Sequence, residues 1–262
     1  MPTQTIPVQV AGQTDVGVKR TGNEDSFSIV QDENLYIVAD GMGGHASGEV
    51  ASQLAVSVIR DFFKRTGEDP EATWPYKMDR SRNYEANRLI TGIKLANLQI
   101  YEKAQSDPRY KGMGTTVVSI LFVREGAYLS HVGDSRIYRI RDDRIEQLTE
   151  DHSFLNDYLK MRPLSKEEIE NFTHKNVITR ALGMKETVQV DINFEVPRID
   201  DVYLLCSDGL SGMVPDEKML ATFRRYSHDL NLVTAKLIEE ANAAGGVDNI
   251  TVIVIRFTGA PA

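Results

Sequence analysis

Acidic residues stand at the ends of several apolar, strand-like segments of the sequence. Four such segments carry an aspartate at one end: Asp40 ends "LYIVAD", Asp134 follows "AYLSHVG", Asp208 follows "VYLLCS" and Asp248 precedes "NITVIVIRF". Glu24 and Asp25 stand in the same way before the short run "FSIV". Each of them alone is most simply a turn residue, because aspartate next to glycine favours turns. Together they suggest a second interpretation, in which the strand ends converge on one acidic site.

Carboxylates in one small volume would repel one another unless they were protonated or neutralised by cations. No cluster of histidine or cysteine accompanies them, and ligands made of oxygen alone favour Mg²⁺ or Mn²⁺ over Zn²⁺. Gly41, which follows Asp40, would leave its backbone carbonyl open to a metal, because no side chain obstructs the approach. The spacing does not show that the strand ends meet, so both interpretations stay open at this point.

Hydrophobic periodicity predicts the elements that would position these residues. Strands are predicted at residues 8–15, 34–40, 115–123, 126–133, 135–141, 144–149, 190–197, 201–208 and 248–257. Helices are predicted at residues 47–65, with Ser47 as the N-cap, and at 83–105, 215–226 and 229–246. Turn signals separate neighbouring strands, as between antiparallel strands, whereas residues 150–176 are polar and read as an insertion. Antiparallel strands with segregated helices indicate an α+β layered fold.

Composition excludes several classes of protein. The net charge of -8 argues against general nucleic-acid binding, which needs a basic surface. The one cysteine, Cys206, excludes an internal disulfide and a multi-cysteine metal cluster, and its apolar surroundings predict a core position. No signal peptide is visible, and the longest apolar run, "TTVVSILFV", is shorter than the roughly 20 residues that cross a bilayer. We therefore expect a cytoplasmic protein that does not enter the membrane.

Eight short motifs follow one another along the chain. In order they are "RTGNEDS", "VADGMGGHASGE", "GMGTT", "HVGDSRIY", "LTEDHS", "ITRALG", "LCSDGLSGMV" and "GGVDNITVIV". This series resembles the metal-dependent serine/threonine protein phosphatases of the type 2C family, and is most similar to the compact bacterial members. The resemblance implies a four-layer α-β-β-α sandwich with two central antiparallel sheets. It also implies a single catalytic domain over residues 1–262, a flap insertion at about residues 153–176, and a monomer.

The resemblance further implies which residues bind metal. Asp40 would bridge two ions, Mn²⁺ or Mg²⁺, and Asp208 and Asp248 would complete the ligands of the first. Gly41, through its carbonyl, and Glu24, directly or through water, would bind the second ion.

Other residues would then serve the chemistry. Asp25 would orient metal-bound waters, and Asn249 would support its neighbour Asp248. Arg20 would bind the substrate phosphate, because a planar fork of donors suits a phosphate. Two cations about 4 Å apart would lower the pKa of a bridging water, and the hydroxide would attack phosphorus in line without a phosphoenzyme.

The sequence departs from the family pattern in two places. Met42 stands where eukaryotic members have a histidine that protonates the leaving group, which makes a metal-bound water the better candidate acid. His45, three residues further on, is expected to have a local structural role. A weak third ion would use Asp134, but Gly212 replaces an acidic residue that often assists it. The separate His152, at the start of the flap, would either approach the phosphate or belong to a helix cap.

Three functions are compatible with these residues. The first is a phosphatase for phosphoserine and phosphothreonine in proteins, opposing a bacterial serine/threonine kinase. The second is a binding module that keeps the fold and has lost catalysis, although every residue of the two-metal site is present. The third is a phosphatase with one dedicated protein partner.

Overall fold

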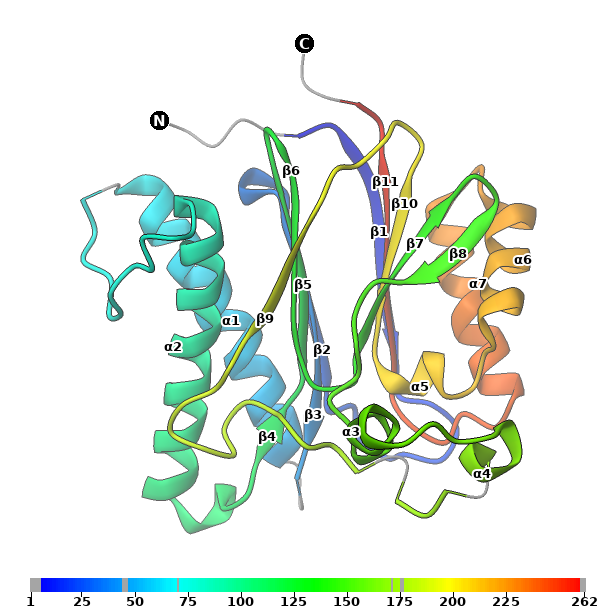
Figure 1. The fold of residues 1–262 in the computed structure, drawn as a ribbon, viewed down its shortest axis with the longest axis horizontal. Coiled ribbons are helices and arrows are strands. Elements are labelled where there is room, and N and C mark those ends of the chain that lie inside the picture. The colour runs from blue at the N-terminus through cyan, green and yellow to red at the C-terminus, as the bar shows by residue number, and fades with distance from the viewer. Residues whose placement is uncertain (1–5, 44–46, 70, 171, 175–176, 260–262) are drawn as a thin grey trace.

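Two antiparallel β-sheets pack face to face at the centre of the molecule, and a pair of helices covers the outer face of each (Figure 1). This computed structural model describes residues 6–43, 47–69, 71–170, 172–174 and 177–259. The predicted α-β-β-α order of layers is confirmed. The elements agree closely with the sequence prediction, apart from a strand at Asp25–Val30 that was not predicted and short helices that periodicity does not reveal.

Every neighbouring pair of strands in the two sheets is antiparallel. The first sheet has the order β1 (Val8–Asp15), β11 (Ile250–Phe257), β10 (Val202–Cys206), β7 (Arg136–Arg141) and β8 (Arg144–Gln147). The second has the order β2 (Asp25–Val30), β3 (Leu35–Met42), β5 (Val117–Val123), β6 (Gly126–Val132) and β9 (Asp191–Glu195), and β4 (Gly114–Thr115) pairs with β3.

The helices lie outside the sheets and along one edge. The second sheet is covered by α1 (Ser47–Glu68) and α2 (Tyr84–Ser106), and the first by α6 (Asp216–Tyr226) and α7 (Leu230–Ala243). Three short helices lie at the lower edge in Figure 1: α3 (Phe154–Met161), α4 (Lys166–Glu170) and α5 (Asp208–Ser211). Two 3₁₀ turns, at Gln31–Glu33 and Pro108–Tyr110, complete the set. Ser47 is the first residue inside α1 rather than its cap, and its hydroxyl donates to the carbonyl of Arg109 (3.2 Å).

Three hydrophobic layers alternate with the four layers of backbone. Along β3, Leu35, Ile37 and Ala39 pack under α1 and α2, whereas Tyr36 and Val38 pack between the sheets. This alternation follows from the period of two in a strand, and both sets are buried because each sheet is covered on both faces. In β10, Cys206 is fully buried in the layer under α6 and α7, so its predicted core position is confirmed.

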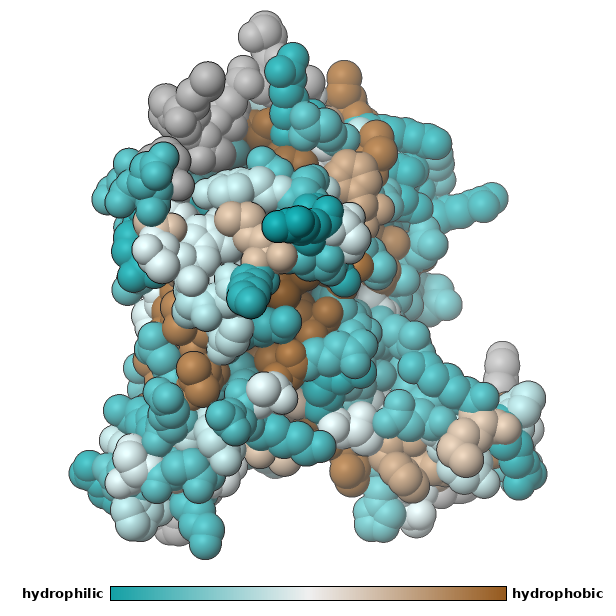
Figure 2. Space-filling model, turned by 60° about the vertical axis from the view of Figure 1, so that its left-hand side comes forward, coloured by the Kyte–Doolittle hydropathy of each residue, from teal (hydrophilic) through white to brown (hydrophobic). Residues whose placement is uncertain are grey.

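The outer surface is mainly polar. Figure 2, in which the α1–α2 side is brought forward, shows hydrophilic residues over most of that face, with hydrophobic residues in smaller areas among them. This distribution is typical of amphipathic helices that turn their apolar side to a sheet. Within the described part of the chain, no helix combines the length and the apolar character that crossing a bilayer requires.

Arg88 joins the two helices that cover the second sheet to each other and to the 3₁₀ turn at Gln31–Glu33. Arg88 of α2 donates to a Glu33 carboxylate oxygen (2.8 Å) and to the Thr66 hydroxyl (2.8 Å), and its guanidinium lies 4.2 Å from the centre of the Phe63 ring. The side chains of Arg88 and Glu33 are only 7% and 10% exposed. The charge of the Arg88 guanidinium is therefore shielded from water, and these contacts are what stabilise it.

We expect Arg88→Ala to lower the free energy of unfolding by about 3–5 kcal/mol, because it removes the cation from a buried pair. A urea titration followed by circular dichroism measures the change. Arg60→Ala is the matched control, since the Arg60–Asp61 pair on the same helical layer is 39% and 63% exposed. That control is expected to change stability by less than about 1 kcal/mol, and equal effects of the two variants would contradict the prediction.

Candidate metal centre

Carboxylates from both sheets meet at one edge of the sandwich. Asp25 at the start of β2 lies directly opposite Asp40 of β3 in the antiparallel register. Asp208 opens α5 immediately after β10 of the other sheet, close enough for its charge to act on the Asp40 carboxyl. The predicted convergence is thus confirmed for these three residues. Like charges directly opposite each other in a sheet, as on Asp25 and Asp40, are destabilising without compensation.

Burial and the charges of neighbouring carboxylates raise the pKa values of Asp25, Asp40 and Asp208. Burial raises the pKa of Asp40 well above its usual range, and the charges of Asp25 and Asp208 add to the effect. Burial likewise raises the pKa of Asp25 to about 7, although hydrogen bonds from Thr251 and Ser207 oppose the shift. The pKa of Asp208 is raised by burial and by the charge of Asp248. The fold therefore holds these groups where ionisation is costly, as catalytic and metal sites commonly do.

Asp134 joins the cluster from the turn after β6. Burial and the charge of Asp208 raise its pKa to about 7. The preceding Gly133 has a φ of 113°, and a Cβ there would lie 2.6 Å from the Cβ of Thr116, so only glycine permits this turn. Gly212 ends α5 one turn after Asp208 and offers no side chain, as the sequence indicates.

The cluster fits hard divalent cations. One carboxylate oxygen of Asp25 and one of Asp134, both Oδ1, are buried and have no hydrogen-bond partner. Buried polar atoms are nearly always satisfied, so two unpartnered oxygens among crowded carboxylates point to a missing positive charge. The donors of the cluster are all oxygen, which matches Mg²⁺ or Mn²⁺.

The loop before β2 brings a cation and a further carboxylate to the same edge. Arg20 donates to Asp248 (2.7 Å), and the half-exposed guanidinium also faces solvent. The carboxyl of Glu24 lies against Gly48 at the start of α1, and burial raises its pKa. Arg20 and Glu24 are thus brought to the cluster, as predicted.

Asn249 does more than the sequence indicates. Its backbone N–H donates to Asp248 (2.8 Å), which is the predicted support. Its side-chain amide also donates to the carbonyls of Val16 and Gly22 and accepts from the backbone N–H of Glu24 (2.8 Å). One side chain therefore fixes the whole loop that carries Arg20 and Glu24.

Gly41 is required by packing as well as by its place beside Asp40. A Cβ at this position would lie 2.1 Å from the carbonyl oxygen of Gly48 and 2.5 Å from that of Glu24. Any side chain would therefore push α1 and the β2 end apart. From the sequence, the reason for a glycine here is only that its carbonyl would be open to a metal; the packing requirement is seen in the structure alone.

Two hydroxyl groups that the sequence analysis did not identify orient the aspartates. Ser207 donates to Asp25 (2.8 Å) and accepts from the backbone N–H of Thr251 (2.9 Å). Thr116 accepts from the backbone N–H of Asp40 (3.0 Å) and is hydrogen-bonded to Ser135. Ser207 precedes Asp208 in "CSDG", and Ser135, the partner of Thr116, follows Asp134 in "GDSR". These adjacencies are the sequence signals for the two hydroxyl groups.

Of the two histidines singled out in the sequence, the structure describes only His152. His45 lies outside the described residues. His152 does not cap a helix itself, because Ser153 caps α3 by accepting from the N–H of Asn156 (3.3 Å). The imidazole of His152 is instead hydrogen-bonded to Gly133 and Asp191.

Comparison with known proteins agrees with this geometry. The model of the family described as protein phosphatase 2C matches residues 18–240. A serine/threonine phosphatase stp of Listeria welshimeri is 38% identical over 253 residues, which cover 93% of this chain and 94% of that protein. The crystal structure of the serine/threonine phosphatase PstP/Ppp of Mycobacterium tuberculosis has a TM-score of 0.83 at 33% identity and covers 96% of this chain and 99% of its own.

A further solved structure bears on the metal. It is the catalytic domain of the serine threonine protein phosphatase PstP in complex with two manganese ions, with a TM-score of 0.77, 33% identity, and coverage of 96% of this chain and 99% of its own. With the matching motifs, the fold and the acidic cluster, these findings show that the chain belongs to the protein phosphatase 2C family of metal-dependent hydrolases that act on phosphoproteins.

Proposed function

We propose that this protein hydrolyses phosphoserine and phosphothreonine in proteins with the help of two Mn²⁺ or Mg²⁺ ions. The observation that carries the proposal is the cluster of Asp25, Asp40 and Asp208, where both sheets place carboxylates whose pKa values are raised by burial. The similarity to serine/threonine phosphatases over nearly the full chain supports the substrate class.

The proposed ligands are those that the family resemblance implies. Asp40, Asp208 and Asp248 would hold one ion, and Asp40, the Gly41 carbonyl and Glu24 the other. When bound, such ions lower the pKa of a coordinated water and offset negative charge on the phosphoryl group.

The remaining groups of the site bind or hold protons. Arg20 would turn from Asp248 to the substrate phosphate, since its guanidinium is half exposed and suits a phosphate. Asp25 would orient waters through Oδ1, since Ser207 already fixes its other oxygen. Asp134 would hold a third, weaker ion, for which its own unpartnered Oδ1 is the supporting observation.

We further propose that residues 1–262 form one monomeric catalytic domain, with residues 153–176 as the flap. Its substrates would include proteins phosphorylated by serine/threonine kinases, and a cytoplasmic location stays a prediction from the sequence. A binding module without catalysis is the second candidate. The presence of every proposed ligand favours the enzyme, as do the hydrogen bonds that hold Asp25 and Asp248 in place.

Hydrolysis of a phosphothreonine peptide with and without Mn²⁺ tests the proposal. We expect phosphate release by the wild type only with Mn²⁺, and a loss in Asp208→Ala of at least about a hundredfold, as for removal of a charged group from an active site. Asp61→Ala, which removes an exposed carboxylate of α1, is the control and should retain full activity. Absence of metal-dependent release from the wild type would favour the binding module.

A further inference from the structure

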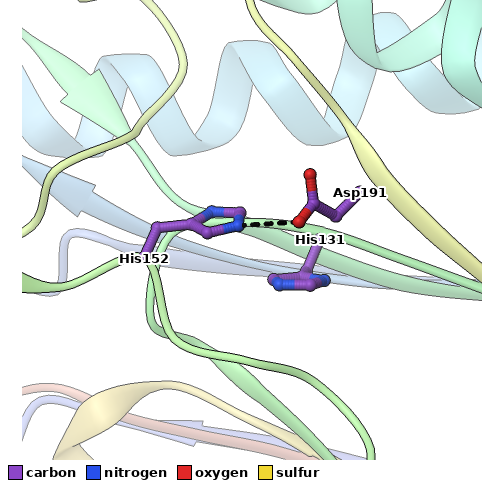
Figure 3. Close-up of side chains that lie close together, drawn as sticks. All are labelled: His131, His152 and Asp191. Atoms are coloured by element: carbon purple, nitrogen blue, oxygen red, sulfur yellow. Dashed lines mark hydrogen bonds and ion pairs between the residues drawn. The ribbon is translucent and has the colours of Figure 1, made fainter. Parts of the chain in front are cut away.

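Three side chains outside the carboxylate cluster gather where the base of the flap meets the second sheet (Figure 3). His131 on β6 and Asp191 at the start of β9 lie opposite each other in the sheet, and His152 immediately precedes the flap. The two imidazole rings stack with their centres 4.6 Å apart. Nitrogen and oxygen atoms of the three residues lie within 4.8 Å of one another, a spacing compatible with a metal ion.

The hydrogen bonds argue against a metal at this place. The backbone N–H of Gly133 donates to Nδ1 of His152 (3.0 Å), so the proton of this ring must lie on Nε2, which donates to Asp191 (3.2 Å). Nε2 of His131 lies 2.8 Å from the carbonyl oxygen of Glu150, which can only accept, so this nitrogen is protonated as well. Neither Nε2 has a lone pair for a cation. The three side chains therefore form a hydrogen-bonded cluster and not a metal site.

Asp191 joins the two ends of the flap. Its Oδ2 accepts from His152, the residue before the flap, and its Oδ1 accepts from Arg180 (2.6 Å), which lies shortly after the flap. The backbone adds two bonds between the same ends: the N–H of Thr179 donates to the carbonyl of His152 (2.8 Å), and that of Phe154 donates to the carbonyl of Val177 (2.8 Å). A carboxylate suits this position because each of its two oxygens accepts a hydrogen bond from one end of the flap.

The flap helix has few other attachments to the body of the protein. No residue of α3 is buried. An element with little buried apolar surface opens easily, so its position depends on the hydrogen bonds at its base. His152 also ties this base to the catalytic edge, because its ring and its backbone N–H both bond to Gly133, the neighbour of Asp134.

We propose that Asp191 is a positioning residue that joins His152 and Arg180, and thereby holds the flap where a protein substrate is bound beside the metal centre. The three residues His152, Asp191 and Arg180 are called the flap-base cluster. The proposal rests on the proposed role of residues 153–176 as the flap. It assigns the cluster to binding of the polypeptide around the phosphoresidue, and not to the chemical step.

Asp191→Asn is the sharpest test, because the amide has the same size but can accept from only one of the two donors. We expect KM for a phosphothreonine peptide to rise roughly three- to tenfold, the cost of ordering side chains that are no longer held in place. For p-nitrophenyl phosphate, which has no polypeptide to contact the flap, kcat and KM should stay within about twofold of the wild type. Amide hydrogen exchange in α3 should become faster.

Glu195→Gln is the matched control. It removes an ion pair from the same strand, where Glu195 is bound to Arg139 and Arg141, away from the flap. It should leave both substrates and the exchange of α3 unchanged. Arg180→Gln should reproduce the effect of Asp191→Asn, and the double variant should be no worse than either single variant, since both act through one cluster.

Equal losses on the peptide and on p-nitrophenyl phosphate would overturn the proposal, as would unchanged exchange in α3. If the wild type hydrolyses neither substrate, the proposed enzymatic function fails. The exchange measurement then still decides whether Asp191 fixes the flap, because it does not depend on activity.

Discussion

Asp40→Asn is expected to lower kcat for a phosphothreonine peptide by about a thousandfold and, at the same time, to make the metal-free protein more resistant to urea. The first effect follows because Asp40 is the one carboxylate proposed to contact both ions. The second follows from its surroundings, where burial and the charges of Asp25 and Asp208 raise the pKa of the carboxyl well above its usual range. An amide of the same shape removes the charge that the metal-free fold accommodates poorly.

Urea titrations in the presence of a chelator, combined with peptide hydrolysis in Mn²⁺, measure the two effects on one preparation. Asp61→Asn, at an exposed position on α1, should change neither quantity. A variant that is inactive but less stable without metal would show that Asp40 contributes to folding, and a variant that stays active would remove Asp40 from the metal site. Opposite changes in activity and stability are typical of residues kept for function.

The strands could be predicted because their composition is local information. The segment "VYLLC" is apolar throughout, and the structure explains why: Val202, Leu204 and Cys206 face α6 and α7, whereas Tyr203 and Leu205 face the other sheet. Such a run predicts a strand covered on both faces. It does not say which strands are its neighbours, so the two-sheet arrangement came from the family resemblance.

The hydrogen bonds that orient the site could not be predicted, because they join residues far apart in the chain. Ser207 contacts Asp25 across 182 positions of sequence, and Asn249 contacts Glu24 across 225. No periodicity connects such residues. The helix α5 escaped prediction for a different reason, since its four residues are too few to show a helical repeat.

The flap base illustrates both limits. Polar, weakly periodic sequence correctly indicated that residues 150–176 lie outside the core, and no residue of α3 is buried. The expected helix-capping neighbourhood of His152 is confirmed, because Ser153 caps α3, but the partners of its side chain, Gly133 and Asp191, lie elsewhere in the chain. Only the fold brings those partners together.

The stability of the metal-free protein is expected to fall as the pH rises from about 4 to about 7, and Mn²⁺ should reverse this trend. The pKa values of Asp25 and Asp134 are raised to about 7 in the folded state, mainly by burial. Between the unfolded and folded pKa values the native state binds more protons than the unfolded state. Each such group therefore costs about 1.4 kcal/mol of stability per pH unit in this window.

The two stacked, buried histidines His131 and His152 act in the opposite direction. Burial lowers the pKa of His131 and His152 below the usual 6.5, so their contribution to stability rises with pH up to that value. Comparison of the wild type with Asp134→Asn isolates the acidic cluster, because both proteins contain the same histidines. Between about pH 5 and about pH 7.5, the free energy of unfolding should fall less in the variant than in the wild type. The difference should correspond to the contribution of one titrating carboxyl.

Urea midpoints in chelator and in Mn²⁺ at these pH values make the comparison. Metal ligands must be deprotonated, so the stabilisation by Mn²⁺ should grow with pH over the same window in which the metal-free protein weakens. Parallel pH profiles for wild type and Asp134→Asn in chelator would show that Asp134 ionises normally in the folded protein. Mn²⁺ stabilisation that does not depend on pH would show that the buried carboxylates are not its ligands. The acidic cluster would then have no energetic explanation, since bound cations are what offset the repulsion and the desolvation of so many buried carboxylates.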